Sequence, residues 1–239
     1  MKQATGRWKF GVTLGALLAM AATLAQGASA QKPANAYPSM APLSQYLIAD
    51  RNAEIALARS AAPVSISGKA TVLVLGPHGY VTAVKGSNGF VCMVDRGWSA
   101  QFDFTEFWNP KLRGPTCFNP QAARSILPIV YKRTELALAG QSREQIMAGI
   151  KAALASKAFP PLEPGAMCYM MSKQAYLNDD AGHWMPHLMF YVPFGTDWGA
   201  DLHGSPVMLN PQFHGVPEPI TVYMVPAGQW SDGTPAPAM

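Results

Sequence analysis

The sequence predicts an α+β protein with an antiparallel sheet of about six strands, including a three-strand meander, and with helices packed on one face of the sheet. Three observations predict this class. Short strand-like segments recur every ten residues between 70 and 95, helix-forming segments follow between 128 and 158, and further strand-like segments come after them. Because strands and helices do not alternate as in βαβ units, we do not expect a parallel sheet.

The first thirty residues have the pattern of a secretory signal peptide. A segment with three basic residues is followed by the uncharged, mostly apolar run Gly11–Leu24 and by the small residues Ala28-Ser29-Ala30. The alternative, an uncleaved membrane anchor, is disfavoured because the apolar run is short for a bilayer span. We therefore predict cleavage after Ala30 and a periplasmic or secreted protein.

The charge of the mature chain limits its partners. The full chain has 18 Lys and Arg residues and 14 Asp and Glu residues. Three basic residues and no acidic ones lie in the predicted signal peptide, so the remaining 209 residues carry a net charge of +1. With no basic cluster, nucleic acid is not an expected partner, and no later segment is apolar and long enough to cross a membrane. A component of the cell envelope or a small ligand remains.

The three cysteines, Cys92, Cys117 and Cys168, all lie in the mature chain. In an oxidising compartment they suggest one disulfide and one remaining thiol. We predict a Cys92–Cys117 disulfide, because Cys117 ends a long connection that must return toward the strand that carries Cys92. Cys168 lies in an apolar segment, where an unreactive buried thiol is more common than a nucleophile with a histidine base.

The mature chain divides into a loose leader over residues 31–42, a single α+β domain over 43–225 and a flexible tail over 226–239. The first predicted helix, 43–61, consists of good helix formers and is stopped by a proline two residues later. Its polar residues, Glu54 among them, are expected on a solvated face.

Three strand-like segments, 70–75, 80–85 and 90–95, follow this helix. They are joined by the turn sequences GPHG and GSNG, and Asn88-Gly89 suits the positive φ values of a tight hairpin turn. This spacing predicts an antiparallel meander. His78 falls at the first turn, where an exposed side chain is expected.

A long connection, residues 97–120, carries six Trp and Phe residues. A connection of this length usually has a function or contains a hydrophobic cluster of its own. Aromatic residues can stack on sugars or other flat ligands, but a satellite hydrophobic cluster is the favoured interpretation. Asp103 and Glu106 also lie here, and no pattern positions them as a catalytic pair.

Two helices are predicted next. The first, 128–139, begins with a proline and ends before Gly140, which suits a C-terminal cap. The second, 142–158, opens with Ser142 and Gln145 in the spacing of a capping box. An apolar stripe on this second helix is expected to cover the sheet.

The last third of the chain alternates strands with long loops. The apolar segments 166–172, 187–192 and 220–225 predict strands. Between them lie two polar loops, 173–186 and 193–219. We expect any functional site at the mouth formed by these two loops, because they flank the same strand.

The candidate metal ligands are His183, His187, His203 and Asp201. Imidazole and carboxylate groups are common ligands of zinc and other divalent transition metals. Met185 and Met189 flank the first two histidines, so Cu(I) is a variant of the same hypothesis. The competing interpretation is that the two loops are independent and that their histidines do not converge.

The combination of the signal peptide, the segment VLGPHGYVTAVKGSNGFVCMVDR, the Cys117 region and the segment GHWMPHLMFYVPF resembles a family of uncharacterised exported bacterial proteins. The resemblance covers residues 43–225. It implies a bacterial envelope location and implies no activity, substrate or site residue.

Several common enzyme signatures are missing, including the nucleophile elbow, the P-loop, the dinucleotide fingerprint and the zinc-protease helix motif. The leading functional hypothesis is therefore a non-enzymatic binding or interaction protein of the cell envelope. The alternative is a metal-dependent hydrolase that uses the histidines of residues 183–214.

Overall fold

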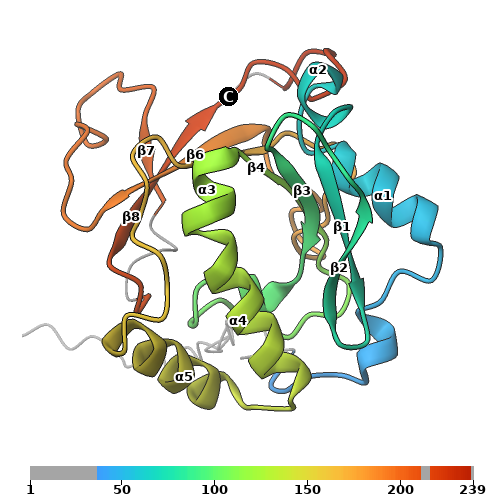
Figure 1. Ribbon diagram of the computed structural model, residues 1–239. Coiled ribbons are helices and arrows are strands. Elements are labelled where there is room, and N and C mark those ends of the chain that lie inside the picture. The colour runs from blue at the N-terminus through green and yellow to red at the C-terminus, as the bar shows by residue number, and fades with distance from the viewer. Residues whose placement is uncertain (1–36, 211–215, 238–239) are drawn as a thin grey trace, which may run out of the picture. The chain divides into compact units, whose positions relative to one another are not determined.

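The computed structural model describes residues 37–210 and 216–237 (Figure 1). The predicted signal peptide and residues 31–36 lie outside this part. The described strands form one sheet in the order β2-β1-β3-β4-β5-β6-β8-β7. The strands are β1 (Thr71–Gly76), β2 (Gly79–Val84), β3 (Val91–Asp95), β4 (Gly114–Phe118), β5 (Met167–Met170), β6 (His187–Pro193), β7 (Met208–Leu209) and β8 (Ile220–Pro226). The helices are η1 (Leu43–Gln45), α1 (Arg51–Arg59), α2 (Val64–Ser67), η2 (Gly97–Ser99), α3 (Pro120–Ser125), α4 (Leu127–Leu138) and α5 (Arg143–Ala155).

The α+β class is confirmed, but the predicted meander is wrong. β1 and β2 form an antiparallel hairpin, whereas β3 pairs with the other edge of β1 and runs parallel to it. The chain reaches that edge by passing close to the start of β1, where Ser87 N donates to Lys69 O. A Cβ at Gly86 would lie 2.2 Å from Thr71 N, so only glycine permits this crossing.

The sheet of the described residues has eight strands rather than about six. The two additional strands, β4 and β7, lie within segments predicted as loops. β4 is completely buried and pairs with β3 and β5. It contains Pro115, opposite Val94, and a proline normally counts against a central strand. This residue explains why the sequence pattern does not reveal β4.

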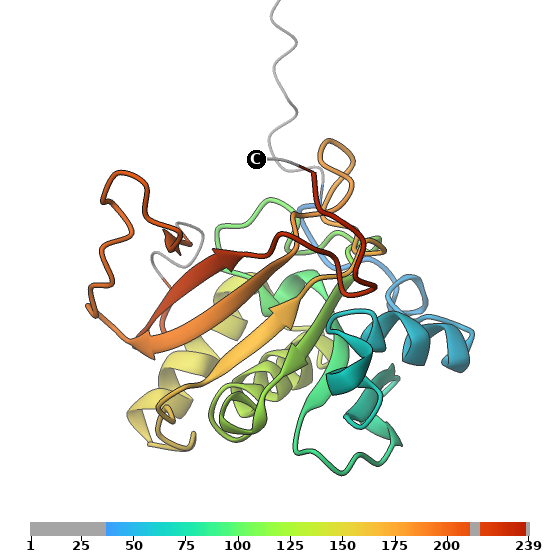
Figure 2. The ribbon, with the colours of Figure 1, turned by 90° about the horizontal axis from the view of Figure 1, so that it is seen from above.

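Helices pack on both faces of the sheet, not on one. Neighbouring residues of a strand point to opposite faces. Val72, Cys92 and Cys117 pack against Ala58 of α1, whereas the residues next to them in sequence, Leu73, Met93 and Phe118, pack against α3 and α4. Figure 2 shows α3 and α4 lying along one face of the strands. The predicted Cys92–Cys117 disulfide is confirmed, and it lies on the α1 face.

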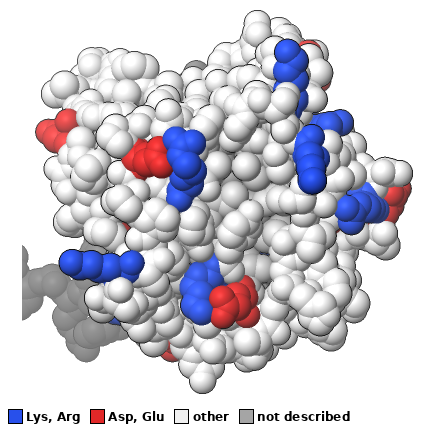
Figure 3. Space-filling view, viewed as in Figure 1, with Lys and Arg blue, Asp and Glu red and all other residues white. Residues whose placement is uncertain are grey.

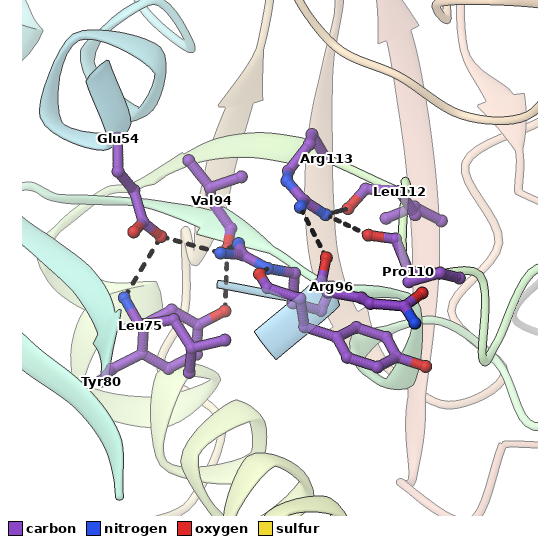
Figure 4. A network of polar contacts seen from close by, with 10 residues as sticks. Glu54, Leu75, Tyr80, Val94, Arg96, Pro110, Leu112 and Arg113 are labelled. Atoms are coloured by element: carbon purple, nitrogen blue, oxygen red, sulfur yellow. Dashed lines mark hydrogen bonds and ion pairs between the residues drawn. The ribbon is translucent and has the colours of Figure 1, made fainter. Parts of the chain in front are cut away.

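The first helix is shorter than predicted. α1 begins at Arg51, because the Asp50 side chain accepts from Asn52 N and Ala53 N and caps the helix there. Glu54 is not solvated as expected: it is 1% exposed and forms an ion pair of 2.9 Å with Arg96. Arg96 also donates to the Tyr46 and Val94 carbonyls, so this network, shown in Figure 4, ties α1 to the end of β3.

The two later helices agree with the prediction. Pro128 lies in the first turn of α4, and Gly140, with a φ of 75°, follows its C-terminus. Ser142 and Gln145 form the expected capping box of α5. The prediction that the apolar stripe of α5 covers the sheet is wrong, because Ile146 and Ile150 pack in the buried cluster of the aromatic connection and α4.

The aromatic connection forms the expected hydrophobic cluster. Trp98, Phe102, Phe107 and Trp108 are buried, and their rings contact one another. The favoured interpretation of this segment is therefore confirmed.

The predicted flexible tail, 226–239, packs against the domain over its described part. Trp230 is buried, Ser231 N donates to Met171 O, and Ala227 N donates to Pro186 O. The described end of the loose leader also packs, since Met40 lies against the aromatic cluster. Both chain ends of the described part are thus better anchored than their composition indicates.

No helix in the described ranges is apolar and long enough to cross a membrane. On the face drawn in Figure 3, charged side chains are scattered, and several stand beside an opposite charge, so no continuous basic surface forms there.

Candidate functional site

A cavity of about 470 Å³ lies between the sheet and α4. Its floor comes from β3, β4, β5, β6 and β8, its roof from Ile126 and α4, and its rim from the segment 177–187. The walls are mostly apolar and include Phe104, Phe118, Ile126, Ile129, Val130, Met170, Met189, Ile220 and Met224. The volume and lining match those of small-molecule sites in proteins.

Several of the residues that line this apolar cavity have a buried polar atom without a hydrogen-bond partner. Among the described residues, seven buried side-chain nitrogen or oxygen atoms have no hydrogen-bond partner. Five of the seven belong to residues that line the cavity: Asp95 Oδ1, Ser99 Oγ, Trp184 Nε1, His187 Nε2 and Glu218 Oε2. Buried polar atoms are normally paired, so their concentration at one place distinguishes the cavity from the rest of the core.

His187 is the first residue of β6 and is 4% exposed. Its Nδ1 atom lies 2.7 Å from the Met185 carbonyl oxygen, which accepts only, so Nδ1 carries the proton. Burial lowers the pKa of His187, and the hydrogen bond to Met185 offsets this in part. The imidazole is therefore neutral near pH 7, and its Nε2 atom is a buried acceptor without a partner.

Trp184 forms part of the cavity wall next to His187. The two rings are in an edge-to-face arrangement with centroids 6.2 Å apart. The far edge of the indole reaches β4, where a Cβ at Gly114 would lie 3.1 Å from Trp184 Cη2. Gly114 thus makes room for the indole, and the Nε1 donor remains unused in the cavity wall.

A buried ion pair closes another part of the wall. Arg133 of α4 donates from Nε and Nη2 to Glu218 Oε1, at 3.0 and 2.6 Å. Its Nη1 atom donates to the carbonyls of Trp98 and Ala100. The donors of Arg133 are thus engaged by the protein, whereas the second oxygen of Glu218 is not.

Asp95 ends β3 opposite Gly114. Burial raises the pKa of Asp95 to about 6, although the hydroxyls of Thr116 and Ser99 and the charge of Arg96 act to lower it. Despite these neighbours, neither Asp95 Oδ1 nor Ser99 Oγ has a hydrogen bond of good geometry. The cavity therefore contains a carboxyl group that changes protonation just below neutral pH.

Cys168 is a free, buried thiol, as predicted. Its Sγ atom lies 3.2 Å from Tyr191 Oη. Burial raises the pKa of the Cys168 thiol to about 12 and that of Tyr191 well above its usual value. A thiol in this state is a poor nucleophile, so the geometry does not support cysteine catalysis.

The structure does not bring the four candidate metal ligands together. His183 and His187 both line the cavity, but the Nδ1 atom of His183 lies 3.0 Å from Trp184 O and its ring packs edge-on against Trp230. Asp201 lines a separate hollow, and His203 is exposed. Within the described ranges, no group of three or more His, Cys, Asp or Glu side chains could hold a metal ion.

The expected location of a site agrees in part with the cavity. Both loops that flank β6 contribute to its lining, the first through Trp184 and the second through Asn210 and Glu218. Sequence reasoning missed Asp95 and Arg133. A signal existed for each, because Asp95 continues an apolar strand and Arg133 lies among the apolar residues of a helix, where a charge needs a partner.

Comparisons of the chain with models of known protein families, with curated proteins and with solved structures find no match.

Proposed function

We propose that the protein is a non-enzymatic binding protein of the bacterial cell envelope that holds a small, mostly apolar molecule in the cavity between the sheet and α4. One observation carries this proposal: five of the seven unpartnered buried polar atoms of the described residues belong to residues that line one apolar cavity. An unpaired buried polar group destabilises a protein by about 1–3 kcal/mol. Such a cost concentrated at one place is typical of a functional site, because proteins otherwise pair their buried polar groups.

The arrangement favours binding over catalysis. His187 is oriented by a backbone carbonyl rather than by a carboxylate, and the nearby thiol of Cys168 is strongly protonated. A nucleophile with an adjacent base is the usual requirement for covalent catalysis. The described residues also offer no metal-ligand group for the alternative, a metal-dependent hydrolase.

Two features support the proposed cellular location. The signal-peptide pattern predicts that the chain leaves the cytoplasm. The disulfide between Cys92 and Cys117 is typical of proteins in oxidising compartments. A carrier or sensor of an apolar molecule is compatible with this location.

A pair of neighbouring substitutions tests the proposal. Met189 of β6 lines the cavity, whereas Leu188, the residue before it, points to the other face of the sheet. We expect the mature protein to bind the fluorescent hydrocarbon diphenylhexatriene. Met189→Trp should fill the cavity and reduce this affinity at least tenfold, whereas Leu188→Trp should change it less than threefold.

The proposal fails if Met189→Trp binds the hydrocarbon as tightly as the wild type does, or if the wild type does not bind it. Circular dichroism and thermal unfolding of each variant verify that a loss of binding is not a loss of fold.

A further inference from the structure

Asp95 lies on the face of the sheet that bounds the cavity. Neighbouring residues of a strand point to opposite faces, so Asp95 shares its face with Met93, which packs in one buried cluster with residues of α3 and α4. A Cβ at Gly114, opposite Asp95 on β4, would lie 3.3 Å from Asp95 Cβ and 3.1 Å from Trp184 Cη2. The Asp95 side chain and the Trp184 ring are therefore neighbours, and both residues line the cavity.

The guanidinium groups of the cavity wall already have carboxylate partners. Arg133 is paired with Glu218 at 2.6 Å. Arg96 is paired with Glu54 at 2.9 Å, and its two other nitrogens donate to backbone carbonyls. Asp95, in contrast, forms no ion pair within 4.0 Å in the described part of the chain. The wall thus contains one carboxyl group whose negative charge has no ion-pair partner among the described residues.

The protein stabilises this charge poorly. Burial raises the pKa of Asp95 to about 6 and outweighs the opposing effect of Arg96, so the carboxyl group is ionised at pH 8 but lacks compensation. Arg113, the residue before Gly114, donates to three backbone carbonyls and does not line the cavity. His187 is neutral near pH 7, because burial lowers its pKa. A positive charge from outside the chain would therefore stabilise the ionised form of Asp95.

A ligand can supply this charge without contacting the buried Oδ1 atom. In an apolar cavity little water screens a charge, so an ammonium group several ångström away still attracts the carboxylate. The neighbouring indole of Trp184 adds to the attraction, because tryptophan rings bind organic cations within about 6 Å of the ring centre. An anionic ligand would instead bring a second uncompensated negative charge into the cavity.

We propose that the cavity prefers an apolar molecule that carries a cationic amine near Asp95 over the same molecule with a hydroxyl or a carboxylate group in that place. The inference rests on the proposed function and defines the chemical class of its ligand. An alkyl or ring-bearing amine has the required charge and apolar surface.

Three ligands with the same ten-carbon chain test this preference. Decylamine, 1-decanol and decanoate, each below its critical micelle concentration, are used at pH 8 to displace diphenylhexatriene from the mature protein. We expect decylamine to displace the probe at a concentration at least tenfold lower than that required for decanol, and decanoate to require the highest concentration. In Asp95→Asn, which keeps the shape of the side chain, the decanol-to-decylamine ratio should fall below threefold. Taking the ratio within each variant cancels a general change in affinity.

Asp103→Asn provides a matched control. It removes the same charge from an exposed residue beside Phe104, which lines the cavity, and should keep the tenfold preference for decylamine. If the wild type binds the probe but decylamine has no advantage over decanol, or if Asp95→Asn keeps the full preference, the inference is overturned while the binding function stands. If the wild type does not bind the probe, both proposals fall.

Discussion

Two buried Arg–Glu pairs, one that holds α1 and one that holds α4, differ in how fully their atoms are paired. In the first pair, Glu54 Oε1 accepts from Arg96 and from Leu75 N, and neither residue is among those with a fully buried unpartnered atom. On the α4 side, Glu218 pairs with Arg133 through one oxygen and leaves the other unpartnered at the cavity. A network without buried unpartnered atoms, called closed below, indicates a structural role. A network that leaves such an atom on a residue of the cavity wall indicates binding.

The largest expected effect is on the closed network. Glu54→Ala leaves the Arg96 charge buried without its partner and should lower the free energy of unfolding by about 3–5 kcal/mol. Urea unfolding monitored by circular dichroism measures this. Glu135→Ala, at an exposed ion pair with Lys132, is the matched control and should change stability by less than about 1 kcal/mol. Equal effects of the two substitutions would remove the distinction between the networks.

The second-largest effect on stability is expected from removing the disulfide on the α1 face. The bond between Cys92 and Cys117 closes a loop with a sequence separation of 25 residues. In the chain-entropy model, the double variant Cys92→Ala/Cys117→Ala should lose about 3 kcal/mol of unfolding free energy. Reduction of the wild type with dithiothreitol should give a similar loss. A non-reducing peptide map that places Cys168 in the bridge would contradict this prediction.

Substitution of Asp95, which lines the cavity, should raise the free energy of unfolding, whereas the two preceding substitutions should lower it. Its folded-state pKa of about 6 is above its ordinary value of 3.8, so the folded protein binds the proton more tightly than the unfolded chain does. The contribution of Asp95 to stability is therefore most favourable below pH 4 and is lost as the pH rises through 6. Asp95→Asn should raise the unfolding free energy at pH 8 by about 2–3 kcal/mol relative to its effect at pH 4.

Denaturant titrations of the wild type and Asp95→Asn between pH 4 and pH 8 measure this difference. A variant whose stability difference from the wild type is the same at both pH values would show that Asp95 is not held in a desolvated site.

The smallest effects are expected at the dispersed metal-ligand candidates. His203 and Asp201 are exposed, so His203→Ala and Asp201→Ala should each change stability by less than about 0.5 kcal/mol. His187→Ala should lower stability measurably, because it removes a buried ring and its bond to Met185. Elemental analysis of the three variants should show no change in zinc content. Loss of bound zinc in any one of them would restore the metal hypothesis.

The sequence predicted those features that depend on local chemistry. Local signals are present in the turn residues Asn88-Gly89, the cap residue Ser142, the strand 187–192 and the disulfide partners Cys92 and Cys117. All but the first lead to the correct element. Asn88-Gly89 does form a turn with positive φ at Gly89, but the turn leads into a parallel pairing rather than a hairpin. Turn chemistry does not specify the partner strand.

Features that depend on distant segments could not be predicted. The burial of Glu54 follows from Arg96, which is 42 residues away, and the cavity is lined by segments from Asp95 to Met224. No periodicity encodes such contacts. The site predicted between the two loops lies close to the cavity, because His187, which ends the first loop and begins β6, also lines the cavity. The choice of histidines as metal ligands rested on composition alone, and composition does not determine convergence.

Native mass spectrometry of the mature protein with diphenylhexatriene tests the central claim most directly, because it counts ligands per chain. One cavity between the sheet and α4 predicts a single bound molecule for the wild type and for Leu188→Trp, and none for Met189→Trp under the same conditions. Binding of several molecules to all three proteins, or of none to any of them, would contradict the account.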